Sequence, residues 1–111
     1  MDCLFCAIAA GSIPADKVYE DELCCVFRDI DPKAPVHLLA IPREHIAGAS
    51  AVDEKSAPLA GHLMAAVAKA AKNEGLTSYR VVSNCGPDAG QTVNHLHYHI
   101  LGGRELSWPP G

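Results

Sequence analysis

One short segment constrains the fold of this chain more than any other: residues 95–101 alternate histidine with apolar side chains. Successive side chains of a β-strand point to opposite faces of a sheet, so His95, His97 and His99 are expected on one face, about 6.6–6.8 Å apart. The apolar residues between them are then expected to face a helix. Three imidazoles in a row are costly to bury unless each is hydrogen-bonded or ligated. The segment therefore predicts a strand over residues 94–101, in a sheet with one apolar and one chemically active face.

The rest of the chain supplies the other elements of such a sheet. Apolar positions at spacings of three and four predict an amphipathic helix over residues 56–73, ended by Gly75. An Ala-rich segment predicts a shorter helix over residues 4–11. Short apolar runs between turn residues predict strands that begin at Val18 and cover 23–27, 36–41 and 79–83. The order of elements favours an α+β fold: a five-stranded, mainly antiparallel sheet with the long helix on one face.

Size and charge restrict the possible functions. We interpret the 111 residues as one domain spanning residues 1–111. Nine basic and 13 acidic residues give a net charge of −4, which disfavours nucleic-acid binding but not the binding of a single nucleotide. No apolar run approaches the ~18 residues of a membrane span, and the N-terminus is acidic where a secretory signal is basic. With an odd cysteine count, five, these features predict a cytoplasmic protein with thiols or a metal site.

The histidine segment is compatible with three kinds of chemistry. It can be a polar sheet face, a catalytic metal site on which alternate histidines converge, or a nucleophilic or acid–base centre. The preceding loop, residues 84–92, offers an amide, glycine N–H groups and a hydroxyl group, all of which suit a phosphate. This loop therefore favours phosphoryl chemistry.

At this point the sequence resembles a known family. The segment 95–101 matches the pattern His-φ-His-φ-His-φ-φ, with φ apolar, of the histidine triad (HIT) family, and similar landmarks lie at 27–30, 35–37, 41–46, 61–64 and 90–93. The ending, residues 102–104 and 108–111, is similar to the nucleotide-binding, Hint-type branch. The resemblance implies a HIT-like fold and a homodimer whose sheet continues across the twofold axis. It also implies a purine nucleoside phosphoramidase, which cleaves the P–N bond of adenosine or guanosine 5′-monophosphoramidates.

The resemblance further implies roles for individual residues. His97 matches the nucleophile and His99 a phosphate contact near the leaving group. His37 and His95 match supporting positions. The nucleotide-binding positions implied are the ribose ligand Asp29, the phosphate loop of Asn84, Gly90, Gln91 and Thr92, the purine slot of Leu4, Phe5, Ile8, Phe27 and Ile30, and Trp108 near the pocket of the partner subunit. Without the resemblance, Asp29 can simply initiate a turn, and Leu4 and Ile8 can be plain core.

The N-terminal cysteines form a second candidate site. Cys3 and Cys6 are a C-x₂-C pair, which alone is half of a zinc site or two unligated thiols. The resemblance implies that His45 and His95 complete a structural zinc site. The other histidine, His62, lies on the long predicted helix and is expected to be structural.

The combined prediction is an enzyme that forms a nucleotidyl-histidine intermediate on His97 and needs no metal for the chemistry. Main-chain N–H groups near Thr92 are expected to stabilise the phosphoryl oxygens. Three alternatives stay open: a nucleotide-binding module with incidental catalysis, a zinc-stabilised interaction domain, and a dinucleotide polyphosphate hydrolase or nucleotide transferase.

Overall fold

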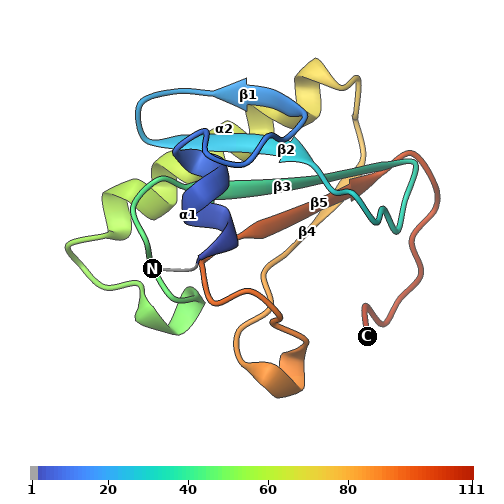
Figure 1. Cartoon of the computed structure of the whole chain (residues 1–111). Helices are drawn as coiled ribbons and strands as arrows, with labels where there is room; N and C mark the ends of the chain where they lie inside the picture. Colours follow the sequence, from blue (N-terminus) through green and yellow to red (C-terminus); the bar gives the residue numbers. More distant parts are fainter. Residues whose placement is uncertain (1–2) are drawn as a thin grey trace.

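The computed structural model describes residues 3–111 and shows a fully antiparallel sheet with a helix on each face (Figure 1). The five strands lie in the order β1-β2-β3-β5-β4. The predicted α+β architecture is therefore confirmed. The elements are α1 (Leu4–Ala9), β1 (Lys17–Glu20), β2 (Cys24–Arg28), β3 (Val36–Pro42), a 3₁₀ turn (Ala49–Ala51), α2 (Ala57–Asn73), β4 (Tyr79–Val82), a second 3₁₀ turn (Pro87–Ala89) and β5 (Tyr98–Gly102).

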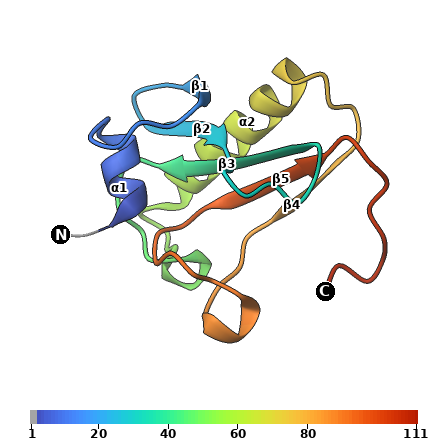
Figure 2. The ribbon, with the colours of Figure 1, turned by 45° about the vertical axis from the view of Figure 1, so that its right-hand side comes forward.

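Helix α2 covers one face of the sheet, as its periodicity predicts (Figure 2). Leu63, Val67 and Ala70 are fully buried against it, and Leu59 packs at the margin of the same core. Gly75 ends the helix with a φ of +76°, a left-handed conformation that costs glycine little. Within residues 3–111, no helix is both long and apolar enough to cross a bilayer.

Helix α1 covers the opposite face, where a second, smaller core forms. Phe5 and Ile8 of α1 pack with Phe27 of β2 and Leu39 of β3. Strand alternation explains the division between the two cores, since every second residue of β2 and β3 points to α1. The neighbouring thiols of β2 follow this alternation: Cys24 and Cys25 are both fully buried, one in each core.

The last strand begins later than the sequence predicts. The strand predicted over 94–101 is β5 (Tyr98–Gly102), so of the three triad histidines only His99 lies in a strand. The antiparallel register ends with the pair of Ala40 and Tyr98. Upstream of this pair, the N–H of Leu96 donates to the carbonyl of Ile46, which lies outside β3, so this part of the chain leaves the ladder. The predicted alternation nevertheless continues upstream, because Leu96 is buried in the α2 core while the histidines beside it contact Phe5.

Candidate functional site

The triad histidines lie on the α1 face of the sheet, where β3 and β5 bring a fourth histidine beside them. His37 on β3 and His99 on β5 are diagonal neighbours across the ladder, with His37 Nε2 2.9 Å from His99 Nδ1. The rings of His97 and His99 are 5.1 Å apart, and Asp29 Oδ2 lies 3.3 Å from His37 Nε2. We call Asp29, His37, His97 and His99 the relay cluster.

The main chain fixes the direction of the hydrogen bonds in the relay cluster. The N–H of Lys33 donates to His37 Nδ1 at 3.0 Å, so this nitrogen carries no proton. The proton of the neutral His37 ring is therefore on Nε2, from which it is donated to His99 Nδ1. His99 in turn keeps its proton on Nε2 and can donate it to a bound group. The cluster is thus an ordered chain of donors that runs from Lys33 to the free edge of His99.

His97 is oriented by carbonyl groups instead. Its Nδ1–H donates to the carbonyl oxygen of His95 at 2.7 Å, which leaves the lone pair of Nε2 free in the neutral ring. The carbonyl of His97 itself accepts a hydrogen bond from Ser83 Oγ at 2.9 Å. Phe5 lies edge-on to the His97 ring, 5.0 Å between centroids. His97 is therefore a buried imidazole with one unshared lone pair, which is the state of a nitrogen nucleophile.

Burial keeps two members of the relay cluster neutral. Desolvation lowers the pKa of His99 to about 4, assisted by His97 and His37. Desolvation also lowers the pKa of His37, although Asp29 works in the opposite direction. Both rings are consequently uncharged at neutral pH, which agrees with the donor chain inferred from the hydrogen bonds.

An apolar cavity of about 280 Å³ opens beside the relay cluster. Its volume is near the lower end of the roughly 300–1,000 Å³ of small-molecule pockets. Phe5 lines this cavity and also contacts His97, so one aromatic ring separates the cavity from the His97 ring. The lining comprises all five residues of the predicted purine slot together with Asp29: Leu4, Phe5, Ile8, Phe27, Asp29 and Ile30, with Ile13, Pro14, Ala15, Arg28, Leu39 and Val93.

Asp29 combines the two roles that its sequence context allows. Its Oδ1 accepts the N–H of Asp31 at 2.8 Å, which is the turn expected before a proline. Its Oδ2 faces His37 at the mouth of the cavity. The turn therefore fixes one carboxylate oxygen and leaves the other beside the cavity. The role of Asp29 as a ribose ligand stays a prediction.

The loop between β4 and β5 is braced by the side chain of Gln91. Its Oε1 accepts the N–H of Gly86 at 2.8 Å, and its Nε2 donates to the carbonyls of Ala47 and Val93. The amide is thus committed to shaping the loop, and a contact with phosphate would come from the main chain. Asn84 lies on the same loop beside Gly90, whose φ of +90° favours glycine.

A second group, which we call the cysteine–histidine cluster, consists of Cys3, Cys6, His45 and His95. Their ligand atoms all lie within 4.8 Å of one another. His95 Nδ1 is 3.3 Å from Cys3 Sγ, 3.5 Å from Cys6 Sγ and 3.2 Å from His45 Nδ1. A tetrahedral zinc with Zn–S of about 2.3 Å and Zn–N of about 2.0–2.1 Å separates its ligand atoms by about 3.3–3.7 Å, so the spacing fits.

The hydrogen bonding of the His95 ring is also that of a metal ligand. Its Nε2–H donates to the carbonyl of Pro42 at 2.9 Å, so the Nδ1 lone pair faces the cysteines. A carbonyl that accepts the second ring N–H is the usual partner of a metal-bound histidine. His95 therefore belongs to the cysteine–histidine cluster by its side chain and to the relay cluster by its carbonyl, which orients His97.

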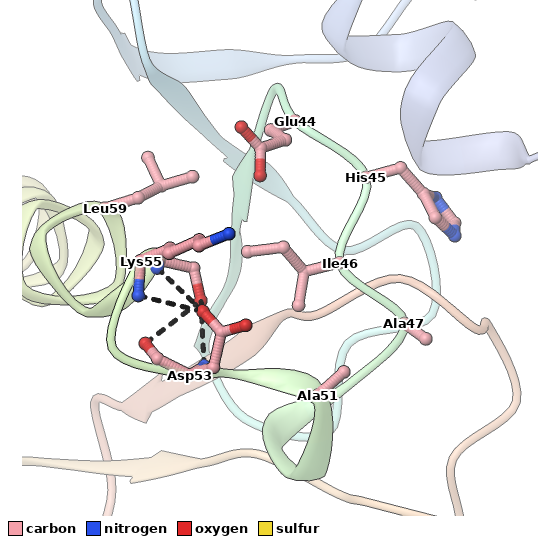
Figure 3. Close-up of a pocket in the computed structure, with 9 residues that line it drawn as sticks. Glu44, His45, Ile46, Ala47, Ala51, Asp53, Lys55 and Leu59 are labelled. Atoms are coloured by element: carbon pink, nitrogen blue, oxygen red, sulfur yellow. Dashed lines mark hydrogen bonds between the residues drawn. The ribbon is translucent and has the colours of Figure 1, made fainter.

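A larger cavity of about 590 Å³ lies on the other side of the loop that carries His45. Figure 3 shows Lys55 and Ile46 directed into it while His45 points away. Asp53 on its wall accepts the N–H groups of Lys55 and Ser56, both at 3.0 Å, and so organises the turn before α2. The Asp53 carboxylate is therefore engaged by the main chain of this turn.

Two of the predicted nucleotide contacts lie away from the interior of the small cavity. Ile30 is fully exposed at its rim, and Trp108 is 81% exposed. In the single chain, Trp108 lies beside the guanidinium of Arg80, 5.9 Å from its ring centroid. Sequence reasoning missed the groups that orient the histidines, which are the N–H of Lys33, the carbonyl of Pro42 and the hydroxyl of Ser83. Two of these are main-chain groups, which no residue pattern marks.

Comparisons with known proteins agree on one family. The model of the HIT domain matches residues 10–106. An uncharacterized HIT-like protein of Synechococcus elongatus is 53% identical over 111 residues, which cover 99% of this chain and 97% of that protein. The crystal structure of a HIT family hydrolase from Legionella pneumophila superposes with a TM-score of 0.96 at 47% identity, covering 99% of this chain and 100% of the other. A histidine triad protein from Clostridium difficile gives a TM-score of 0.92 at 45% identity, with 96% and 95% covered.

Proposed function

The chain belongs to the HIT family, and from this premise we propose that it is a hydrolase of purine nucleoside 5′-phosphoramidates of the Hint-type branch. The observation that carries the proposal is the free Nε2 lone pair of His97, one aromatic ring away from an apolar cavity. The base occupies the cavity against Phe5 and Phe27, and Asp29 Oδ2 accepts from the ribose hydroxyls. The 5′-phosphorus then lies in front of His97.

The reaction proceeds in two displacements at phosphorus. His97 Nε2 attacks, a new N–P bond forms, and the bond to the amine breaks. The amine leaves with the electron pair and takes a proton from water, which leaves a hydroxide ion. The nucleotidyl-histidine is cationic, and the His95 carbonyl stabilises it by accepting the Nδ1–H. This hydroxide then attacks phosphorus, the bond to His97 breaks, and its electron pair returns to Nε2 as the nucleoside monophosphate leaves. His99 donates its Nε2–H to the phosphoryl group throughout.

The cysteine–histidine cluster is proposed to hold a structural zinc ion. Cys3 and Cys6 bracket the first turn of α1, and the rest of this helix lines the cavity with Phe5 and Ile8. Bound zinc would supply a rigid cross-link between α1, the loop after β3 and the segment before β5. Its contribution is to the shape of the cavity, and the chemistry at phosphorus is carried by the histidines.

The functional unit is proposed to be a homodimer. Strand β4 forms one edge of the sheet, and a twofold mate can pair with it. The outer face of α2 exposes Met64, and the tail exposes Trp108. Light scattering at micromolar concentration should give about twice the 11.7 kDa chain mass, and truncation after Leu106 should change leaving-group preference. A monomer with full activity would refute the dimer, and unchanged selectivity would refute the role of the tail.

Turnover of a fluorogenic adenosine phosphoramidate tests the activity. Acid quenching during turnover should trap an adenylyl group on His97, located by mass spectrometry of peptides. Diadenosine triphosphate, which offers the same nucleoside with a P–O–P bond, is the comparison substrate. Faster hydrolysis of this compound would instead identify a dinucleotide polyphosphate hydrolase. Nucleotide binding without turnover of either compound would identify a binding module.

A further inference from the structure

The loop between β2 and β3 contributes more to the relay cluster than its surface position indicates. Lys33 is exposed, and its ammonium group is paired with Asp31 at 2.6 Å. Its main-chain N–H, however, is the group that donates to His37 Nδ1 at 3.0 Å. The state of a buried histidine is therefore set by the position of one exposed peptide unit.

Arg104, just after β5, holds this residue from its other side. Its Nη2 donates to the carbonyl oxygen of Lys33 at 3.0 Å, and its Nη1 donates to the carbonyl of Glu105 at 2.9 Å. The turn itself packs on the loop, because a Cβ on Gly103 would come within 2.9 Å of Pro35 Cβ. Lys33 thus uses its N–H for His37 and its carbonyl for Arg104.

These contacts close a circuit that begins and ends on the same strand. His99 is on β5, His37 donates to it from β3, Lys33 orients His37 from the loop, and Arg104 orients Lys33 from the end of β5. Every other group on the circuit is supplied by the main chain or by a histidine ring, buried at His37 and half-buried at His99. The guanidinium of Arg104 is its one exposed side-chain link among the described residues.

We propose that Arg104 is a positioning residue: by holding the carbonyl of Lys33, it keeps the Lys33 N–H on His37 Nδ1 and so sets the direction of donation from His37 to His99. Without Arg104, the loop is free to move and water can donate to or accept from His37 Nδ1. The ring can then carry its proton on either nitrogen. In the Nδ1–H form, His37 can no longer donate to His99.

The charged groups near His37 determine how its ring is held when Arg104 is removed. Asp29 faces Nε2, while Asp31 and Lys33 flank the loop and neutralise each other. His99 is the neighbour on β5. Asp29 can accept only from the Nε2–H form, so it favours the donating tautomer and limits the change to a mixture of the two forms. His37 is buried in either case, so the expected effect is on the direction of hydrogen bonding.

The test is the tautomer of His37, read from two-bond ¹H–¹⁵N correlations in protein labelled with ¹⁵N-histidine. The wild type should show the Nε2–H form alone, and Arg104→Ala should show a mixture. Arg104→Lys, which retains one donor, should restore most of the Nε2–H form. Lys33→Ala retains the peptide group and should leave the tautomer unchanged. Lys33→Pro removes the N–H itself and should reproduce the mixture with Arg104 intact.

Arg43→Ala is the matched control for a merely structural role. Arg43 also donates to main-chain carbonyls, those of Ala9 and Asp21, but it does not contact the loop that holds Lys33. Its loss should lower stability and leave the His37 tautomer pure. A pure Nε2–H form in Arg104→Ala, or a mixture in Arg43→Ala as well, would overturn the proposal.

The kinetic consequence rests on the proposed function, whereas the tautomer does not. Arg104→Ala should lower kcat for the phosphoramidate about 3- to 10-fold with KM changed less than twofold, because the nucleotide cavity is untouched. A 3- to 10-fold rise in KM with an unchanged kcat would instead contradict the proposal that Arg104 positions His99. A wild type that shows no turnover would disprove the proposed function, and the tautomer measurement would still decide the role of Arg104.

Discussion

Two clusters of histidines lie side by side on the α1 face, and His95 in one and His37 in the other have main-chain partners of opposite kinds. In the cysteine–histidine cluster, a carbonyl accepts the outer N–H of His95, so that lone pairs converge on a common point. In the relay cluster, an N–H donates to the outer nitrogen of His37, so that protons are directed inward to His99. An inward lone pair suits a cation or, as proposed for His97, an electrophilic phosphorus, and an inward proton suits a phosphate oxygen. The partner on the far side of the ring decides which chemistry a histidine performs.

This rule explains why ligand distance alone does not identify a metal site. Asp29, His37 and His99 also place their ligand atoms within 4.8 Å of one another. A metal on His37 Nε2 would have to replace a proton while Nδ1 still accepts from Lys33, which requires an anionic ring. The hydrogen bonding of the relay cluster is therefore unsuited to a metal, even though its ligand atoms are spaced as in a metal site.

The largest expected effect separates the clusters by function. His97→Ala removes the nucleophile and should lower turnover of the adenosine phosphoramidate about 10³-fold or more, while AMP binding stays within a few-fold. The cavity does not depend on this ring, so calorimetry with AMP serves as the control for folding. Activity within tenfold of wild type would show that another group attacks phosphorus.

The second effect concerns the cysteine–histidine cluster. The double variant Cys3→Ser, Cys6→Ser should lose about one zinc per chain by elemental analysis, because both thiolates are removed. Its free energy of unfolding should fall by about 2–4 kcal/mol relative to the zinc-loaded wild type. Acid-quenched protein should still carry the adduct on His97. An unchanged zinc content would exclude these cysteines as ligands.

Much of this arrangement is predictable from sequence, and the remainder has a common cause. The periodicity of α2 and the alternation at 95–101 predicted both faces of the sheet, because side-chain burial follows directly from residue type. The start of β5 was predicted four residues too early, since the N–H of Leu96 pairs with the carbonyl of Ile46 outside β3. The groups that orient His37 and His95 are a peptide N–H and a carbonyl, which almost every residue of a chain possesses. Only the fold determines which of them meets a ring.

The third effect is a pH dependence from the relay cluster. Burial lowers the pKa of His99 to about 4, whereas an unfolded chain titrates near the ordinary value of 6.5. Between these values the unfolded state binds more protons, so stability falls as the pH falls from about 6.5 towards 4. His99→Gln cannot titrate, and its loss of stability between pH 7 and pH 5 should be smaller than that of wild type by about 1–2 kcal/mol. Urea unfolding at both pH values measures this difference, and parallel losses in the two proteins would contradict it.

The smallest effect comes from a histidine outside both clusters. His62 on α2 donates to Asp21 Oδ2 at 2.7 Å, which ties the helix to the turn between β1 and β2. Asp21 Oδ2 also accepts from the hydroxyl of Tyr19 at 2.8 Å, and Asp21 Oδ1 accepts the N–H groups of Leu23 and Cys24. Both carboxylate oxygens of Asp21 thus accept from donors of the protein itself. This arrangement ties elements of the fold together and agrees with the predicted structural role of His62.

Partial burial opposes ionisation of Asp21, but these donors together hold the pKa of Asp21 below its usual range. A carboxylate with a lowered folded pKa stabilises the protein above its unfolded pKa and loses this contribution as the pH falls. His62→Ala should therefore lower the free energy of unfolding by about 1 kcal/mol at pH 7, since the pair is partly exposed. The difference from wild type should persist at pH 3, because protonation of Asp21 in the unfolded state is common to both proteins and the folded carboxylate is still ionised. His62→Gln, which retains a donor, should recover part of the loss. Activity and zinc content should match the wild type, and a change in either would place His62 in one of the two clusters after all.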